Sequence, residues 1–364
     1  MYQLFNSNPF GSLLPAETAA AITEGLNGNY HYAFEFEPGC GGALFAEHLA
    51  KHFTSGERLL FNADIHMATG DEHLVKILSR SFVQTFAGDL GRIEGALKKL
   101  IPTATPRLVM DESPHVDIDY GAEPDKLFSN LIDLPELMGI KEGRNATVIW
   151  SGFCRIEEIF GAEGPRFFTD KVHTQTVTNH IMIGSGVTKT AQKLNDRVSG
   201  RVRIFNGTGL VPSNILEAFL IEGSMEGEGA LNAETAATIV RLANGKLEAA
   251  LNIAKGYSCY CGSVPDAVAL ARAMDDILAS AASAYEQVWE LLNPRQRGVL
   301  YGLTRSEDKS IYSEWFIKEF GFKTATNLQA AIRALDAKGI LYKRGKRWIF
   351  SDPFFALWVK RKCR

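Results

Sequence analysis

The chain has 364 residues, which is long enough for two or three domains of ordinary size. Its composition, 46% hydrophobic and 22% charged, indicates a soluble globular protein with a sizeable hydrophobic core. No uncharged apolar stretch reaches the roughly 18 residues of a membrane-spanning helix, and Met1–Pro15 has no secretory pattern, so we expect a cytoplasmic protein with no membrane contact. The net charge of −3 is uneven: the last 60 residues hold 14 Lys/Arg against 6 Asp/Glu, which leaves about −11 for the remainder.

The cysteines and histidines do not form a recognisable metal or disulfide pattern. Five cysteines lack framework spacing, and Cys259-Tyr-Cys261 has no second pair to complete a zinc site, so we predict free thiols. His115, His173 and His180 also lack metal-ligand spacing and are interpreted as ordinary polar residues.

The first readable feature follows an N-terminal arm and a helix over Ala16–Leu26. An alternating apolar strand over residues 32–36 runs into a glycine-rich turn and a helix over Phe45–Phe53, which is the layout of a phosphate-binding loop. Any nucleotide contacts would come from Gly39, Cys40, Gly41, Gly42 and Ala43. Alignment on the motif G-x-x-x-x-G-K-[ST] places Gly42 at the lysine and Ala43 at the hydroxyl residue, so both groups that handle charge are absent.

Strand and helix patterns then alternate. Strands are predicted over Glu57–Ile65, Arg107–Glu112, Ala146–Ser151 and Val172–Gly184, with helices over Asp71–Leu100 and Pro124–Met138. This alternation predicts a parallel sheet, with Asp111, Glu112 and Ser151 at the carboxyl ends of its strands.

A turn-rich stretch, Ser199–Pro212, is the expected hinge. Beyond it, helices are predicted over Ser213–Leu220, Ala233–Leu242, Lys246–Tyr257 and Val264–Leu292. We therefore predict three domains, with the α/β core over 1–206, a helical lid over 207–290 and a third domain over 291–364.

The third domain reads as a winged helix-turn-helix. Helices over Pro294–Leu303, Ile311–Phe320 and Ala325–Lys338 precede strands over Ile340–Arg344 and Arg347–Phe350. The residues expected to contact double-stranded DNA are Lys323, Thr324, Thr326, Asn327, Arg333, Lys343, Arg344, Lys346 and Arg347. The alternative is a protein-docking or autoinhibitory module. The terminal Lys360–Arg364 is either a further DNA contact or a disordered tail.

Together these motifs resemble the AAA+/STAND group of P-loop ATPases, and most closely its prokaryotic, archaeal-like members with a helical lid and a C-terminal winged helix. The resemblance covers nearly the whole chain. It rests on Asn8-Pro-Phe, the loop at 36–43, Leu108-Val-Met-Asp111-Glu112, Trp150-Ser-Gly, Gly164-Pro-Arg-Phe-Phe, Leu242-Ala-Asn-Gly-Lys-Leu and Tyr342 with Asp352-Pro-Phe-Phe-Ala-Leu-Trp.

The resemblance implies roles for several residues. Asp111 would support magnesium, Glu112 would polarise the attacking water, Ser151 would be a nucleotide sensor and Arg166 an arginine finger. The alternatives are a solvated strand end for the two acids, a strand terminator for Ser151 and an arginine that covers the core edge for Arg166. Glu37 stands where relatives carry proline, and the lid sequence Asn244-Gly-Lys-Leu lacks their proline.

Two functional hypotheses follow. The first is a degenerate, non-hydrolysing AAA+/STAND-like scaffold or regulator that binds DNA or a protein partner through its winged helix, with no cofactor. The second is an active or weakly active ATPase switch that resembles replication initiators or helicase loaders and binds ATP or ADP with Mg²⁺, using a lysine from elsewhere such as Lys189 or Lys246. Either form is compatible with homo-oligomers.

Overall fold

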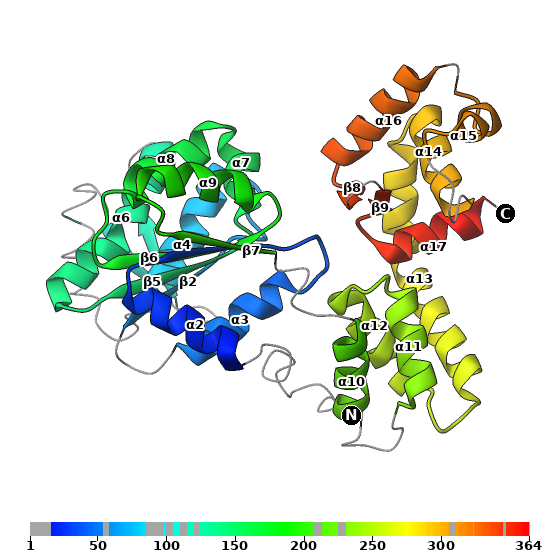
Figure 1. Ribbon diagram of the computed structural model, residues 1–364, viewed down its shortest axis with the longest axis horizontal. Coiled ribbons are helices and arrows are strands. Elements are labelled where there is room, and N and C mark those ends of the chain that lie inside the picture. Colours follow the sequence, from blue (N-terminus) through cyan, green and yellow to red (C-terminus); the bar gives the residue numbers. More distant parts are fainter. Residues whose placement is uncertain are drawn as a thin grey trace. The chain divides into compact units, whose positions relative to one another are not determined.

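The computed structural model describes residues 16–53, 58–84, 98, 105–109, 115–119, 124–206, 213–224, 231–305, 311–322, 324–344 and 347–363. These divide into two compact units (Figure 1). The core unit comprises the described residues of 16–37 and 41–206, and the C-terminal unit those of 38–40 and 213–363.

The core unit is built on a parallel sheet, which confirms the predicted fold class. Its strands are β1 (His31–Glu35), β2 (Leu59–Asp64), β5 (Ala146–Ser151), β6 (Thr178–Gly184) and β7 (Val202–Asn206). They lie in the order β2-β5-β6-β1-β7, and every neighbouring pair is parallel. The central strands are buried on both faces, as expected for continuous apolar runs in an α/β sheet.

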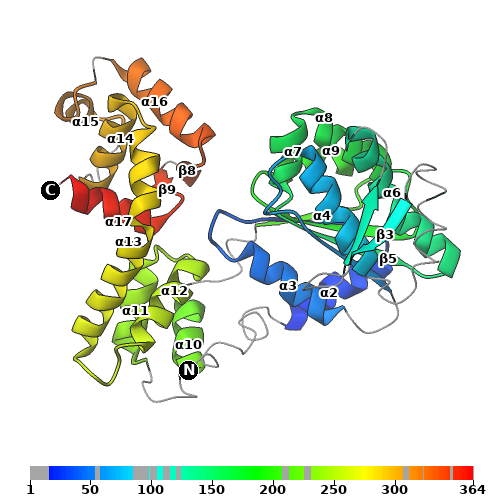
Figure 2. The same cartoon turned by 180° about the vertical axis from the view of Figure 1, so that it is seen from behind.

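Helices cover both faces of this sheet. Figures 1 and 2 show α2 (Ala16–Asn27) and α3 (Gly42–His52) on one face; on the other lie α4 (Asp71–Gln84), α6 (Pro124–Glu142), α7 (Cys154–Phe160), α8 (Glu163–Val172) and α9 (Val187–Arg197). Successive residues of β1 therefore meet different layers. Phe34 meets Phe45 of α3 at a ring-centroid distance of 4.8 Å, whereas Ala33 joins the core on the opposite face.

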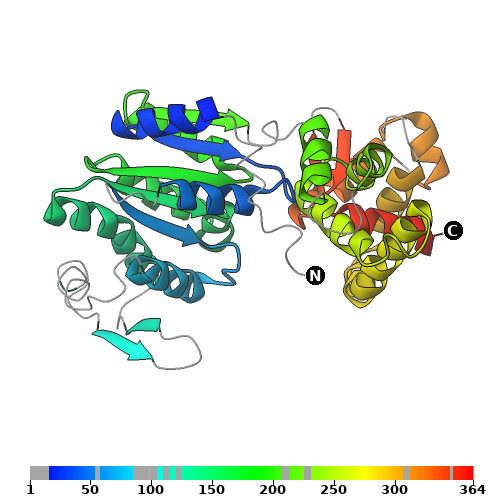
Figure 3. The same cartoon turned by 90° about the horizontal axis from the view of Figure 1, so that it is seen from below.

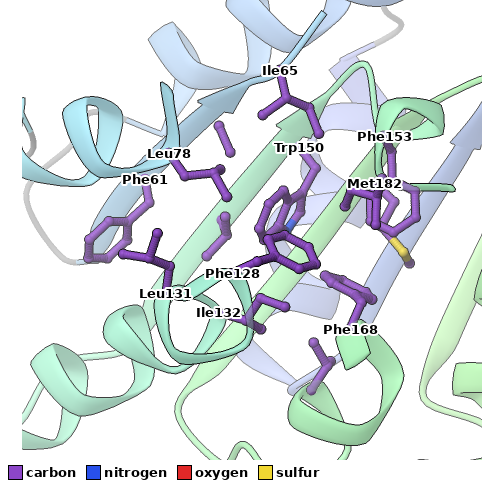
Figure 4. Packing of buried hydrophobic residues seen from close by; sticks show 14 of the residues in the cluster. Phe61, Ile65, Leu78, Phe128, Leu131, Ile132, Trp150, Phe153, Phe168 and Met182 are labelled. Carbon is purple, nitrogen blue, oxygen red and sulfur yellow. The ribbon is translucent and has the colours of Figure 1, made fainter. Parts of the chain in front are cut away.

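Trp150 is at the centre of the core on the second face (Figure 4). Its indole meets Phe168 edge-on, with the ring centroids 5.5 Å apart. The indole N–H donates to Nδ1 of His180 at 2.9 Å, and Nε2 of His180 lies 2.7 Å from the Gln175 side-chain oxygen. His31 completes the network, because its Nδ1 accepts the backbone N–H of His180 at 3.1 Å. The buried polar groups are thus satisfied by one another.

The placement predicted for the strand Arg107–Glu112 is wrong. Its described part, β3 (Thr105–Val109), pairs antiparallel with β4 (His115–Asp119), and the two form a separate hairpin (Figure 3, cyan). The described residues of this strand therefore do not belong to the parallel sheet. Asp111 and Glu112 lie outside the described part of the chain.

Two other boundaries need correction. The strand predicted over Val172–Gly184 begins only at Thr178, because α8 continues to Val172. The stretch Ser199–Pro212, predicted as a hinge, contains the edge strand β7, which pairs with β1 in the register His31–Val202. The turn residues Ser199 and Gly200 adopt positive φ just before that strand.

The first part of the C-terminal unit is helical, as predicted. It contains α10 (Ser213–Ser224), α11 (Ala233–Leu242), α12 (Leu247–Ser258) and the 25-residue α13 (Asp266–Glu290). Asn232 caps α11 by accepting the backbone N–H of Thr235.

The winged helix follows, also as predicted. Its helices are α14 (Pro294–Arg305), α15 (Glu314–Glu319) and α16 (Ala325–Ala337), and its wing is β8 (Leu341–Arg344) paired with β9 (Arg347–Phe350). Ser313 and Thr324 cap α15 and α16 through their side-chain hydroxyls.

The interpretation of the basic C-terminus as a disordered tail is wrong for its described residues, and its contact with DNA stays a prediction. Residues 353–362 form a helix, α17 (Pro353–Lys362), capped by Asp352. Arg361 pairs with Asp275 and Lys362 with Glu286, each at 2.7 Å, so two of its cations are directed to α13. All five cysteines are free, as predicted, and none of the described helices is long and apolar enough to cross a membrane.

The histidine network predicts a stability that depends on pH. Burial, and secondarily the charge of Arg201, lowers the pKa of His31 from 6.5 to about 4, and burial holds the pKa of His180 well below its usual value. Because the unfolded chain binds protons that the folded chain cannot, stability is retained above about pH 6.5 and falls as the pH drops towards 4. We expect His31 alone to cost on the order of 2 kcal/mol between pH 7 and pH 5, measured from urea unfolding curves.

The substitution His31→Gln tests the cause, since its amide oxygen can still accept the His180 N–H. We expect a flatter pH dependence in this variant. The exposed His73→Gln is the matched control and should leave the pH dependence in place. Identical slopes in His31→Gln and the parent would contradict the assignment.

Candidate functional site

The glycine-rich loop between β1 and α3 has the backbone conformation of a phosphate-binding loop. Gly39 and Gly41 adopt φ values of 76° and 87°, a left-handed conformation that favours glycine. Gly41 is the N-cap of α3, and its carbonyl accepts the N–H of Phe45 at 2.9 Å. The predicted strand–loop–helix layout is therefore confirmed.

Aromatic side chains occupy the base of this loop. Phe36 is only 3% exposed, its backbone N–H extends the sheet to the Gly184 carbonyl, and its ring lies 5.3 Å from that of Phe45. A Cβ added to Gly42 would meet the Cβ and Cγ of Phe36 at 3.3 Å and Ile183 at 3.5 Å. A side chain at the lysine position of the motif would therefore press on Phe36.

The two lysines considered as substitutes are placed differently. Lys189 is exposed on α9. Lys246 is 1% exposed in the C-terminal unit, and its ammonium donates to the carbonyls of Pro38 and Ser351, each at 2.7 Å. The same ammonium lies 4.6 Å from the ring centroid of Tyr342. Its charge is compensated inside the fold, so binding a phosphate would require it to exchange these partners.

At the carboxyl edge of the sheet, Glu35 is held by the first turn of α9. Its carboxylate accepts the backbone N–H groups of Gly186 and Thr188 and the Thr188 hydroxyl, the last at 2.8 Å. An acid at a helix N-terminus compensates the partial positive charge there. The Glu35 side chain thus fixes the start of α9 to the end of β1.

Ser151, predicted as a sensor, lies at this edge within a polar cluster that sequence reasoning did not assemble. Its buried hydroxyl is 3.1 Å from Nδ1 of His66, and Asp64 contacts the same nitrogen at 3.1 Å. The hydrogen bond from His66 holds the pKa of Asp64 below its usual value. Because both partners meet one ring nitrogen, the trio lacks the two-sided geometry of a proton relay. The feature of the sequence that could have indicated this cluster is the change from apolar to polar residues at the end of β2, where Asp64 lies.

No group of three or more His, Cys, Asp or Glu residues in the described ranges is arranged to hold a metal ion. Arg166 lies on the surface of α8 with its side chain 66% exposed, at 3.5 Å from Glu163 and 3.8 Å from Asp170. The interpretation that Arg166 covers a core edge is wrong, since it forms ion pairs along its own helix. Its role as an arginine finger stays a prediction.

The winged helix brings most of the predicted DNA contacts to its surface. Thr326 and Arg333 are exposed on α16, Asn327 beside them is half-buried, and Lys343, Arg344 and Arg347 are exposed on the wing. Lys323 and Lys346 lie outside the described residues.

A groove of about 520 Å³ in the lid was not predicted. Its apolar lining includes Leu242, Leu270 and Met274, and its rim includes Asp266 and Arg361. Asp266 accepts hydrogen bonds from Tyr257 and Asn232, and Arg361 pairs with Asp275. Because α11, α13 and α17 contribute to it, no local sequence pattern marks this groove.

Solved structures resemble this chain over nearly its whole length. A Walker-type ATPase of Pyrococcus abyssi, PABY2304, matches with a TM-score of 0.57 at 14% identity, over 95% of each chain. The Aeropyrum pernix ORC1 protein, solved with DNA, matches with a TM-score of 0.50 at 11% identity, over 97% of this chain and 96% of that one.

The chain has the AAA+ P-loop ATPase fold. The resemblance predicted from the motifs is thereby confirmed at the level of fold. The Aeropyrum pernix ORC2 protein in its ADP form also matches, with a TM-score of 0.51 at 10% identity, over 96% and 94% of the two chains.

Residues 283–361 match the model of a family described as a probable winged helix domain, so this module begins inside α13. No curated protein sequence matches the chain. At these identities the comparisons establish the AAA+ fold and its winged helix.

The contribution of the buried Lys246 hydrogen bonds to the stability of the C-terminal unit can be measured by substitution. The substitution Lys246→Met keeps the apolar stem but removes the donor to two carbonyls, and we expect it to cost on the order of 2 kcal/mol of unfolding free energy. Urea unfolding measures the loss. Lys255→Met, at an exposed position of α12, is the control and should change stability little. Equal stability of the two variants would show that the buried contacts contribute nothing.

Proposed function

We propose that the protein is a non-hydrolysing AAA+-fold scaffold or regulator that binds double-stranded DNA through its winged helix. The observation that carries this proposal is the close approach of Phe36 to Gly42 at the lysine position of the phosphate-binding loop. An architecture built for nucleotide switching persists, while the loop is packed with apolar side chains.

The residues present do not fit ATP with magnesium. A working loop needs a lysine on the outer phosphates and a hydroxyl on the metal, and Gly42 and Ala43 supply neither. Electrostatic stabilisation of a transferring phosphoryl group has few substitutes, and Lys246 is held by two carbonyls. The alternative function, an active or weakly active ATPase switch, would need another cation in place of the missing lysine.

The DNA-binding part of the proposal rests on charge and exposure. The wing presents Lys343, Arg344 and Arg347 to solvent, at the end of a chain whose positive charge is concentrated in its last 60 residues. Cations on an exposed hairpin contact phosphates and displace counterions. The similar ORC1 structure was solved in complex with DNA, which supports the same use here.

We expect titration calorimetry with Mg²⁺ and ATP to show no saturable binding at micromolar nucleotide. The variant Phe36→Gly/Gly42→Lys/Ala43→Thr should bind ATP, because it restores the cation, the hydroxyl and the space for them. Gly42→Lys/Ala43→Thr is the matched control and should bind ATP more weakly than the triple variant, because Phe36 still presses on the side chain at position 42. Micromolar binding by the parent, or ATP turnover that Glu112→Gln abolishes, would contradict the proposal.

We expect duplex DNA binding that weakens steeply with salt. Changing Lys343, Arg344, Lys346 and Arg347 together to Ala should weaken binding of any duplex sequence and reduce the slope of log K against log salt by about 3 to 4. Gel shifts over a salt series measure both quantities. The charge-matched control is Lys51, Lys76, Lys189 and Lys193 to Ala, four exposed positions of the core unit. Equal losses of DNA affinity in the two variants would show that the wing does not contact DNA.

A further inference from the structure

We propose that the wing carries a stacking site for unpaired DNA bases, formed by Tyr312 and Trp348 beside Lys343, Arg344 and Arg347. We call this surface the aromatic wing site. The inference rests on the proposed DNA binding and deepens it, because it names a duplex with an adjoining single strand as the preferred ligand.

Exposed aromatic residues single out this part of the molecule. Tyr312 is 42% exposed and Trp315, three residues later, is 38% exposed. Among the described residues, the other large hydrophobic side chains with comparable exposure are aliphatic: Met67, Ile140, Ile204, Val268 and Leu291. The winged helix thus presents the exposed aromatic faces, although it has a well-formed core in which Phe316, Leu328 and Phe350 are buried.

A hydrogen bond orders the aromatic pair. The indole N–H of Trp348 donates to the Tyr312 hydroxyl at 3.0 Å, joining β9 to the segment that leads into α15. Trp348 also packs against the domain core, which holds one side of its ring. Tyr312 is therefore presented in a restricted orientation, so little side-chain entropy is lost when a base stacks on it.

The hairpin that carries Trp348 also carries three cations among its described residues. Lys343 is directly opposite Trp348 across the hairpin, and Arg344 is opposite Arg347 at the next position. Because side chains alternate along a strand, Lys343 lies on the face that carries Trp348, and the two arginines lie on the other face of the same ribbon. A strand that stacks on Tyr312 would thus have cations within reach of its phosphates on both sides of the wing.

This combination suits an unpaired strand better than a duplex. Aromatic side chains stack on bases whatever their identity, and basic side chains follow the backbone. Bases within a duplex are already stacked on their neighbours and expose only their edges. The basic residues therefore contribute to binding any DNA, whereas the aromatic pair contributes where a base is unpaired.

Fluorescence anisotropy with the full-length chain tests the site. The probes are a labelled blunt duplex, the same duplex with a single-stranded overhang of either polarity, and the overhang strand alone. We expect the parent to bind an overhang duplex about tenfold more tightly than the blunt one, the effect of roughly one stacked base. Tyr312→Ala should remove this preference and leave blunt-duplex affinity unchanged.

Two variants control for indirect effects. Tyr312→Phe keeps the ring and should keep most of the preference, and Leu291→Ala, at a position 77% exposed in the same unit, should keep all of it. Blunt-duplex binding without an overhang preference, or a preference that survives Tyr312→Ala, would overturn the aromatic wing site while leaving the proposed function intact. If the parent protein binds none of the DNA probes, the proposed function is overturned, and the aromatic wing site with it.

Discussion

The ring of Phe36 lies under the first turn of α3, in contact with Phe45 and beside Gly42. This packing joins the strand, loop and helix around which the parallel sheet is organised. Since a protein interior is packed as densely as an organic crystal, a side chain added at Gly42 would require the ring of Phe36 to shift. The junction is stabilised by the burial of aromatic surface.

Polar groups in both units are likewise held by partners within the protein. Glu35 anchors the first turn of α9, and Lys246 donates to two carbonyls in the C-terminal unit. Ser151 shares one nitrogen of His66 with Asp64. Burying a charge or a hydroxyl is costly unless it is paired, and each of these groups has its partner within the protein. The side chains of Glu35, Lys246 and Ser151 therefore help to hold neighbouring segments of the fold together.

The cations of the C-terminal unit are used in two ways. Arg361 and Lys362 of α17 pair with acids of α13, while Lys343 is exposed on the wing. Cations near α13 thus support the attachment of the last helix. Those on the wing extend into solvent, where a polyanion can reach them, and the exposed ring of Tyr312 lies in the same region.

The sequence alone determined those helices, strands and turns that are specified by residues close together in the chain. The loop glycines and the helical periodicity of α16 led directly to the phosphate-loop layout and the winged helix. Tertiary structure alone decided which strands pair. β3 reads like a buried sheet strand yet forms a hairpin with β4, and β7 completes the sheet from a turn-rich stretch. Strand pairing depends on partners distant in sequence, so no local pattern encodes it.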